Sequence, residues 1–119
     1  MANEISILVD ATLNNGKVTN SFSPGSVSIN QTNARVIDLI QSIGTSEEAI
    51  AFTDFTSAGW VFFQNLDSTN YVECGLTGSY PMRLSANDPP TAFRVNTGAT
   101  IYMKANTGAC DVHIVGYDA

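Results

Sequence analysis

Residues 59–75 read GWVFFQNLDSTNYVECG, and this stretch decides the fold class. It opens with the unbroken apolar run WVFF at 60–63, whose aromatic and β-branched side chains are typical of a strand in a sandwich core. The short polar side chains at 67–70 can bond the local backbone and therefore favour a turn. The apolar pattern resumes at 71–72. The stretch predicts a β-hairpin with a four-residue loop. The residues predicted for the core are Trp60, Phe62 and Val72.

Turn signals recur along the rest of the chain every 8–12 residues, a spacing typical of a β-sandwich, jelly roll or barrel. The Asn-Gly pair at 15–16 is the strongest hairpin signal, because both residues accept a positive φ. A further turn is predicted at 23–26, which contains Pro and Gly. Pro81 places its strand, 80–84, at a sheet edge or marks the start of a strand, since proline has no N–H to donate. We therefore expect a single-domain, jelly-roll-like β-sandwich over 1–119, with about eight to nine short antiparallel strands.

Residues 35–43 leave an alternative open. Val36, Leu39, Ile40 and Ile43 follow the i, i+3, i+4, i+7 spacing of a helical stripe. The segment is only about two and a half helical turns long, which is marginal for a helix. The segments on both sides of it have the pattern of strands. We expect a strand here, with a short helix as the rival interpretation.

The composition argues against several classes of protein. The net charge is −6, and the five basic residues are scattered along the chain. Nucleic-acid binding needs clustered Lys and Arg, and an acidic surface disfavours anionic membranes. No apolar run approaches the ~20 residues of a membrane span, and the N-terminus lacks the pattern of a signal peptide. We expect a protein made in a cytoplasm, with no nucleic-acid or membrane partner.

Neutral residues must supply most of the polar surface, because only 13% of the chain is charged. The chain has 11 Ser, 12 Thr and 11 Asn. A neutral surface rich in Thr and Asn is frequent in extracellular and virion β-proteins. The composition therefore hints at such a setting and does not by itself name a function.

The two cysteines, Cys74 and Cys110, have no CxxC spacing and no neighbouring His/Cys cluster. We expect two reduced thiols that behave as small, partly buried hydrophobes. A disulfide remains the alternative if their strands are neighbours.

No catalytic motif occurs in the sequence. His113 is the only histidine, and a lone histidine on a strand is usually structural. Glu47 and Glu48 are adjacent, so on a strand they would point to opposite faces and could not form a facing glycosidase pair. The loop aspartates lack the alternating spacing of a calcium site. We expect no enzyme, no cofactor and no metal, and aromatic strand residues leave sugar binding as an alternative.

Two segments together resemble a known group of proteins. GTSEEA at 44–49 is followed, ten residues later, by the stretch at 59–75, and then by AFRVNTG at 92–98 and IYMKA at 101–105. This arrangement resembles the small β-rich structural proteins of tailed bacteriophages, including capsid decoration (cement) proteins. The resemblance covers about 29–117.

The resemblance implies a binding module without chemistry of its own. A decoration protein sits on the capsid surface of the virion, across neighbouring subunits of the major capsid protein, often as a homotrimer. Because it binds only the assembled head, it stabilises the head by mass action. The alternative is a phage tail, fibre or receptor-binding protein that recognises host glycans.

The N-terminal segment is a predicted capsid contact, since termini are mobile until a partner orders them. The predicted contact residues are Met1, Ala2, Asn3, Glu4, Ile5, Ser6 and Ile7. Deleting this segment is expected to weaken attachment and to leave the fold intact.

Overall fold

The computed structural model describes residues 3–50, 52, 55, 58–96 and 98–119. These residues form ten β-strands and no helix, which confirms the all-β prediction. No helix that could cross a membrane is therefore found in the described part of the chain. The chain divides into two compact units, Met1–Thr32 and Asn33–Ala119, which are described in turn.

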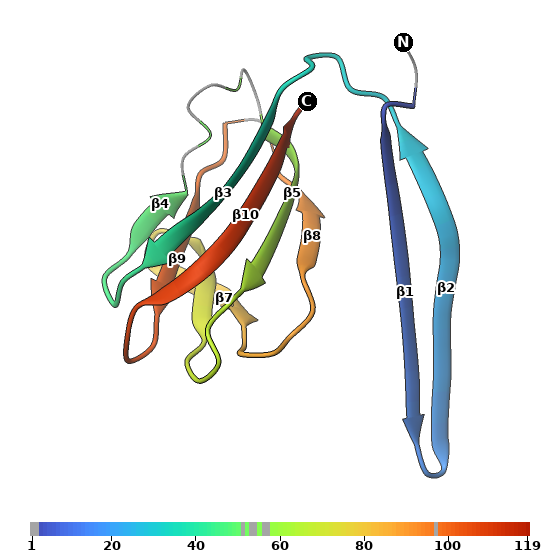
Figure 1. Ribbon diagram of the computed structural model, residues 1–119, viewed down its shortest axis with the longest axis horizontal. Coiled ribbons are helices and arrows are strands. Elements are labelled where there is room, and N and C mark those ends of the chain that lie inside the picture. The colour runs from blue at the N-terminus through green and yellow to red at the C-terminus, as the bar shows by residue number, and fades with distance from the viewer. Residues whose placement is uncertain (1–2, 51, 53–54, 56–57, 97) are drawn as a thin grey trace. The chain divides into compact units, whose positions relative to one another are not determined.

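The strands pair antiparallel throughout (Figure 1). The first unit contains β1 (Ile5–Asn15) and β2 (Val18–Ile29). The second contains β3 (Val36–Ile43), β4 (Glu48–Ile50), β5 (Ala58–Asn65), β6 (Val72–Leu76), β7 (Ser79–Leu84), β8 (Thr91–Arg94), β9 (Ile101–Ala105) and β10 (Cys110–Asp118).

The first unit is a long β-hairpin, as the Asn-Gly pair predicts. Asn15 pairs with Val18, so Gly16 and Lys17 form a two-residue turn. Gly16 has a φ of 55°, in the left-handed region that glycine adopts without a Cβ clash. A positive φ at the first turn residue matches the twist of the flanking strands, which keeps them paired.

The turn predicted at 23–26 is wrong, because β2 runs through it without a break. Ser23 and Pro24 together oppose the single residue Asp10, which is a β-bulge. Proline cannot donate to the ladder, and Gly25 has a φ of 88°. The bulge accommodates Pro24 and Gly25 within a continuous strand. Residues that favour a turn are therefore present here without a reversal of the chain.

The second unit consists of two four-stranded sheets. Their strand orders are β3-β10-β5-β8 and β4-β9-β6-β7, and Figure 1 shows β10 between β3 and β5. Among the described strands of this unit, only β6 and β7 follow one another within one sheet. Every other connection passes from one sheet to the other. Pro81 lies in β7 at the edge of its sheet, as predicted.

The central hairpin predicted from WVFF onward is wrong, because β5 and β6 lie in different sheets. The turn chemistry is present but builds an arch between the sheets. The buried Asn65 side chain donates to the carbonyls of Asn70 and Leu84, each at 2.9 Å, and accepts from the Asp67 N–H. The Asp67 carboxylate accepts from the N–H groups of Thr69 and Asn70. These bonds satisfy the buried polar groups of the bend.

Residues 35–43 form a strand, as expected, and not a short helix. All eight residues of β3 pair with β10, from Ile43 opposite Cys110 to Val36 opposite Tyr117. An eight-residue ladder satisfies more backbone groups than two helical turns, whose ends leave donors and acceptors unpaired. The tertiary partner therefore overrides the helical spacing of the apolar residues.

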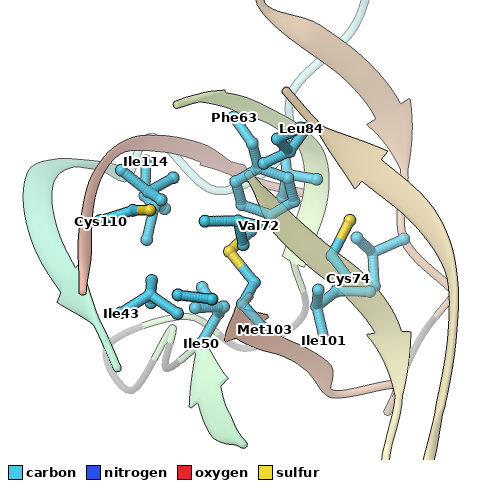
Figure 2. Close-up of a cluster of buried hydrophobic side chains, with 14 residues drawn as sticks. Ile43, Ile50, Phe63, Val72, Cys74, Leu84, Ile101, Met103, Cys110 and Ile114 are labelled. Atoms are coloured by element: carbon cyan, nitrogen blue, oxygen red, sulfur yellow. The ribbon is translucent and has the colours of Figure 1, made fainter. Parts of the chain in front are cut away.

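The core lies between the two sheets and takes alternate residues from β5, β6, β9 and β10, with one residue each from β3, β4 and β7 (Figure 2). Its buried members are Ile43, Ile50, Val61, Phe63, Val72, Cys74, Leu84, Val95, Ile101, Met103, Ala105, Cys110, Val112 and Ile114. Val72 is in the core, as predicted. The same prediction is wrong for Trp60 and Phe62. These two are half-buried, because period-two alternation turns them away from the core-facing Val61 and Phe63.

Cys74 and Cys110 are free and buried, as predicted. Figure 2 shows them on different sides of the cluster. Burial raises the pKa of the Cys74 thiol to about 11, and burial is also the main cause that raises the pKa of Cys110. Both cysteines therefore act as neutral apolar side chains, since the thiolate is the reactive form.

Candidate functional site

The outward side of the β3-β10-β5-β8 sheet carries a group of apolar and aromatic side chains among polar ones. In β10 the residues at 112 and 114 are buried, so those at 113, 115 and 117 point away from the core. The strand register places matching side chains of β3, β5 and β8 beside them. We call this surface the aromatic face. Its apolar members are Val36, Ile40, Trp60, Phe62, Ala92, Val115 and Tyr117.

Two edge residues of the aromatic face are strongly exposed. Val36 and Ile40 on β3 have exposed fractions of 62% and 61%. Next to them, the rings of Phe62 and Tyr117 meet edge-on, with centroids 5.1 Å apart. A contiguous apolar patch on a protein surface is a common mark of an interaction site.

The outward side of the other sheet is charged instead. Glu73 on β6 lies between Arg83 on β7 and Lys104 on β9, so a row of three alternating charges crosses three strands. The Arg83 guanidinium lies 3.8 Å from the centre of the Tyr71 ring. Opposite charges at directly facing strand positions stabilise a solvated sheet surface. The aromatic face also carries charges, because Asp38 lies opposite Val115 and Arg94 lies opposite Trp60. It differs from the other surface in that these charges stand among exposed apolar and aromatic side chains, which suits a partner with apolar groups.

An open recess of about 340 Å³ lies on the aromatic face. Its lining residues are Phe62, Phe63, Gln64, Pro90, His113, Val115 and Tyr117. Most of these are apolar, with Gln64 and His113 as the polar side chains. A pocket of this kind binds through apolar contact and uses a few polar groups to fix orientation. It could accept an apolar side chain of a partner protein or the flat face of a sugar.

His113 is held by a neighbour that is distant in sequence. Its Nε2 lies 2.6 Å from Oδ1 of Asp38 on the adjacent strand. The bond fixes the orientation of the imidazole ring at the recess. The described residues contain no group of three or more His, Cys, Asp or Glu that could hold a metal ion. The single histidine thus has a structural partner, which sequence alone could not have identified.

The first part of the predicted N-terminal contact is tied to the hairpin. Residues 1–2 lie outside the described residues. The Asn3 N–H donates to Oδ1 of Asn30 at 2.7 Å, and the Glu4 carboxylate accepts from the Gln31 N–H at 3.1 Å. That backbone hydrogen bond is the main cause that lowers the pKa of Glu4.

The remaining part of the predicted contact, 5–7, belongs to β1 and pairs with 27–29 of β2. Deleting 1–7 would therefore remove three strand pairs together with the two anchoring bonds. The deletion shortens the hairpin, so it cannot test attachment separately from hairpin structure. The role of this segment as a contact stays a prediction.

Glu47 organises the end of the β4-β9-β6-β7 sheet. Its carboxylate accepts hydrogen bonds from the Thr77 hydroxyl at 2.6 Å, the Gly78 N–H at 2.9 Å and the Tyr80 hydroxyl. These hydrogen bonds lower the pKa of Glu47, and the bond from Thr77 has the largest effect. The bond between Tyr80 and Glu47 raises the pKa of the Tyr80 hydroxyl. Its neighbour Glu48 accepts from the Gly44 N–H instead. The two carboxylates serve separate turns, so they form no facing pair.

Comparisons with protein-family models, curated proteins and solved structures found no match. The function is therefore inferred from the surfaces that the strands build. The aromatic face had a signal in the sequence, because His113, Val115 and Tyr117 alternate with the core residues of the same strand. The recess had none, since Pro90 and Phe62 come from segments that only the fold brings together.

Proposed function

We propose that this protein is a structural protein of a tailed-phage virion, and specifically a capsid decoration protein that acts by binding alone. The observation that carries the proposal is the aromatic face, which presents apolar side chains on the outside of a complete sandwich. The proposed partner on the aromatic face is the major capsid protein at the surface of the assembled head.

The strand order supports the same proposal. We infer that the orders β3-β10-β5-β8 and β4-β9-β6-β7, with repeated crossing between the sheets, are those of a jelly roll built from two Greek keys. Jelly rolls recur in viral capsid and lectin domains. A fold hosts many functions, so the strand order supports the setting and the surfaces must carry the role.

The energetics suit a clamp that is present in many copies. Apolar contact at the recess, with the polar groups of Gln64 and His113 beside it, resembles the anatomy of a protein–protein interface. Few charges need to be paired, since only 13% of the chain is charged. Binding to the assembled head alone would stabilise it by mass action. A closed homotrimer would match a three-fold site on the head.

The alternative is a tail, fibre or receptor-binding protein that recognises host glycans. The recess gives this alternative a specific basis, because Phe62 and Tyr117 offer aromatic surface beside the polar groups of Gln64 and His113. Sugar sites combine an aromatic platform with a few polar groups that fix orientation. The same residues would then contact a sugar and not a protein.

The experiment adds purified protein to heads that lack it and measures the bound copies and the heat resistance of the heads. We expect saturable binding and a higher temperature of head disruption. The variant Ile40→Asp, on the aromatic face, should lose at least tenfold in affinity, because an unpaired carboxylate is costly to bury. Ala49→Asp, which introduces the same charge on the outward side of the other sheet, should bind like wild type.

Three outcomes separate the candidates. Binding that Ile40→Asp alone weakens supports a head protein that docks through the aromatic face. No binding to heads, together with binding to tails or host glycans, establishes the alternative. Equal losses in both variants would contradict the aromatic face as the contact surface.

A further inference from the structure

The β1–β2 hairpin has one apolar face. Residues directly opposite each other in an antiparallel pair project on the same side, so the register assigns every side chain to a face. We call the apolar side the hairpin face. Its apolar members are Ile5, Ile7, Val9, Ala11, Leu13, Val18, Phe22, Val27 and Ile29. The opposite side has Ser6, Leu8, Asp10, Thr12, Asn14, Thr19, Ser21, Ser26 and Ser28.

The bulge is what makes the hairpin face continuous. In a regular strand the residues of β2 would alternate by odd and even number, and Phe22 would lie on the opposite side from Val27. The extra residue opposite Asp10 changes the alternation, so that Phe22 and Val18 join the same side as Val27. The polar side is consistent with this assignment, because the Ser6 and Ser26 hydroxyls bond each other at 2.8 Å.

The hairpin face is exposed along most of its length, and only its base at Ile5 is buried. Phe22, Val18 and Val27 have exposed fractions of 56%, 57% and 55%. A two-stranded hairpin is at best marginally stable in water, because it has no second layer to bury its apolar side. A face of this length that exposes a phenylalanine and several β-branched residues therefore requires a partner surface.

The sizes of the paired residues indicate what that partner is. In four successive rows a large apolar residue sits beside a small or polar one, and the large residue changes strand from row to row. The rows are Val9–Gly25, Phe22–Ala11, Leu13–Asn20 and Val18–Asn15. If the hairpin faces point toward a symmetry axis that is parallel to the strands, β1 of one copy lies next to β2 of the next copy. Residues that pair within one chain then lie at the same height as their counterparts in the neighbouring copy. Each large side chain then faces a small one, which is how packed layers interdigitate.

We propose that copies of this chain cover one another's hairpin faces, packed row on row about an axis parallel to the strands in a closed cyclic oligomer. Phe22 of one copy lies against Ala11 of the neighbouring copy, and Val9 lies against Gly25. Every copy offers the same β1 edge and β2 edge to its neighbours, and alignment of the rows leaves no shift along the axis, so the copies form a ring and not a filament.

The charge distribution permits a second copy as the occupant. Each chain has a net charge of −6, so copies repel one another at a distance, and a contact that is free of charge adds no buried carboxylate to that cost. The hairpin face contains no Asp, Glu, Lys or Arg, since Asp10 lies on the opposite side and Glu4 and Lys17 lie outside the strands. The bulge also interrupts β2, which disfavours edge-to-edge strand pairing and leaves the face as the contact surface. This interface does not depend on capsid binding.

Two matched variants test the interface by native mass spectrometry and light scattering of the full chain. Phe22→Asp puts a carboxylate in the middle of the hairpin face. Ser21→Asp puts the same charge on the adjacent residue, which faces the other side opposite Thr12. We expect a closed wild-type oligomer, a monomeric Phe22→Asp variant and a Ser21→Asp variant that stays assembled. Circular dichroism should show the same strand signal in the second unit for all three proteins.

Cross-linking tests the row alignment without altering Phe22. Chains with Leu13→Cys are mixed and assembled with chains of different mass that have Asn20→Cys, and a short bis-maleimide is added. We expect a link between the two kinds of chain, and none in wild type, whose two thiols are buried. A monomeric wild type, an assembled Phe22→Asp variant, equal dissociation by Ser21→Asp, or no link between Leu13→Cys and Asn20→Cys would overturn the proposal. Each outcome is independent of head binding, which is measured separately.

Discussion

The hairpin and the sandwich use the same alternation of apolar and polar side chains with opposite results. In β5 the alternate residues Val61 and Phe63 are fully buried, because a second sheet lies over them. In β2 the alternate residues Phe22 and Val18 stay more than half exposed. Alternation therefore predicts that one face of a strand will be covered. It does not predict whether the cover comes from the same chain or from another.

The largest effect should come from the same truncation made in each region. Phe63→Ala should lower the free energy of unfolding of the sandwich by about 3–5 kcal/mol, because it leaves a cavity in a packed core. Phe22→Ala should leave the sandwich within about 0.5 kcal/mol of wild type. Denaturant unfolding followed by the fluorescence of Trp60, the single tryptophan, measures both. Equal losses would end the distinction between the two regions.

A smaller effect is expected from the arch between β5 and β6. Asn65→Leu has a similar volume but loses two donated bonds and one accepted bond, and it leaves buried carbonyls unpaired. The free energy of unfolding should fall by about 2–3 kcal/mol. The matched change Asn14→Leu, on the exposed polar side of the hairpin, should leave it unchanged. A neutral Asn65→Leu variant in the same denaturant experiment would show that the arch does not depend on these bonds.

Alkaline pH should distinguish the regions through Cys74, since the hairpin has no thiol. Its pKa is raised from 9.0 to about 11 in the folded protein. A raised pKa means that the thiol loses its proton at a lower pH in the unfolded chain than in the folded one. The stability that the protonated Cys74 thiol contributes is therefore fully present below pH 9 and is lost as pH rises toward 11. At pH 10 the loss should be about 1 kcal/mol. The fall in stability between pH 8 and pH 10 should be shallower in Cys74→Ala, and an identical fall in both proteins would contradict the burial of this thiol.

The smallest effect is expected from removal of Pro24. Without it, Phe22 and Gly25 are two positions apart and share a side by regular alternation, so the hairpin face is kept. We expect the oligomer and the sandwich stability to match wild type. Loss of the oligomer in size-exclusion chromatography with light scattering would show that the bulge itself, and not only the face it aligns, is needed for assembly.

The sequence predicts the strands better than their partners. The hairpin turn signalled by the Asn-Gly pair and the edge position of Pro81 follow from backbone chemistry that is local. The turn is present one residue later than the pair, at Gly16 and Lys17, and Pro81 lies on an edge strand. The bend at 67–70 is also local, but its side chains cannot indicate whether the next strand joins the same sheet or the other one. This is why an arch was predicted as a hairpin.

The candidate surfaces show the same limit. The run at 60–63 is apolar on both sides, so it could not reveal which alternate residues face the core. For this reason the sequence did not predict the aromatic face: Trp60 and Phe62 were assigned to the core, and they lie on that face instead. The bond between His113 and Asp38 joins residues 75 positions apart and depends on the pairing of β3 with β10.

Amide hydrogen exchange at a high and a low protein concentration distinguishes the two regions by what covers them. The sandwich buries its own apolar residues, and in the proposed oligomer the hairpin depends on other copies of the chain. The account predicts that amides of β1 and β2 are protected at high concentration and lose that protection on dilution, whereas those of β5 and β10 stay protected at both. Protection of the hairpin amides that does not change with concentration would contradict it.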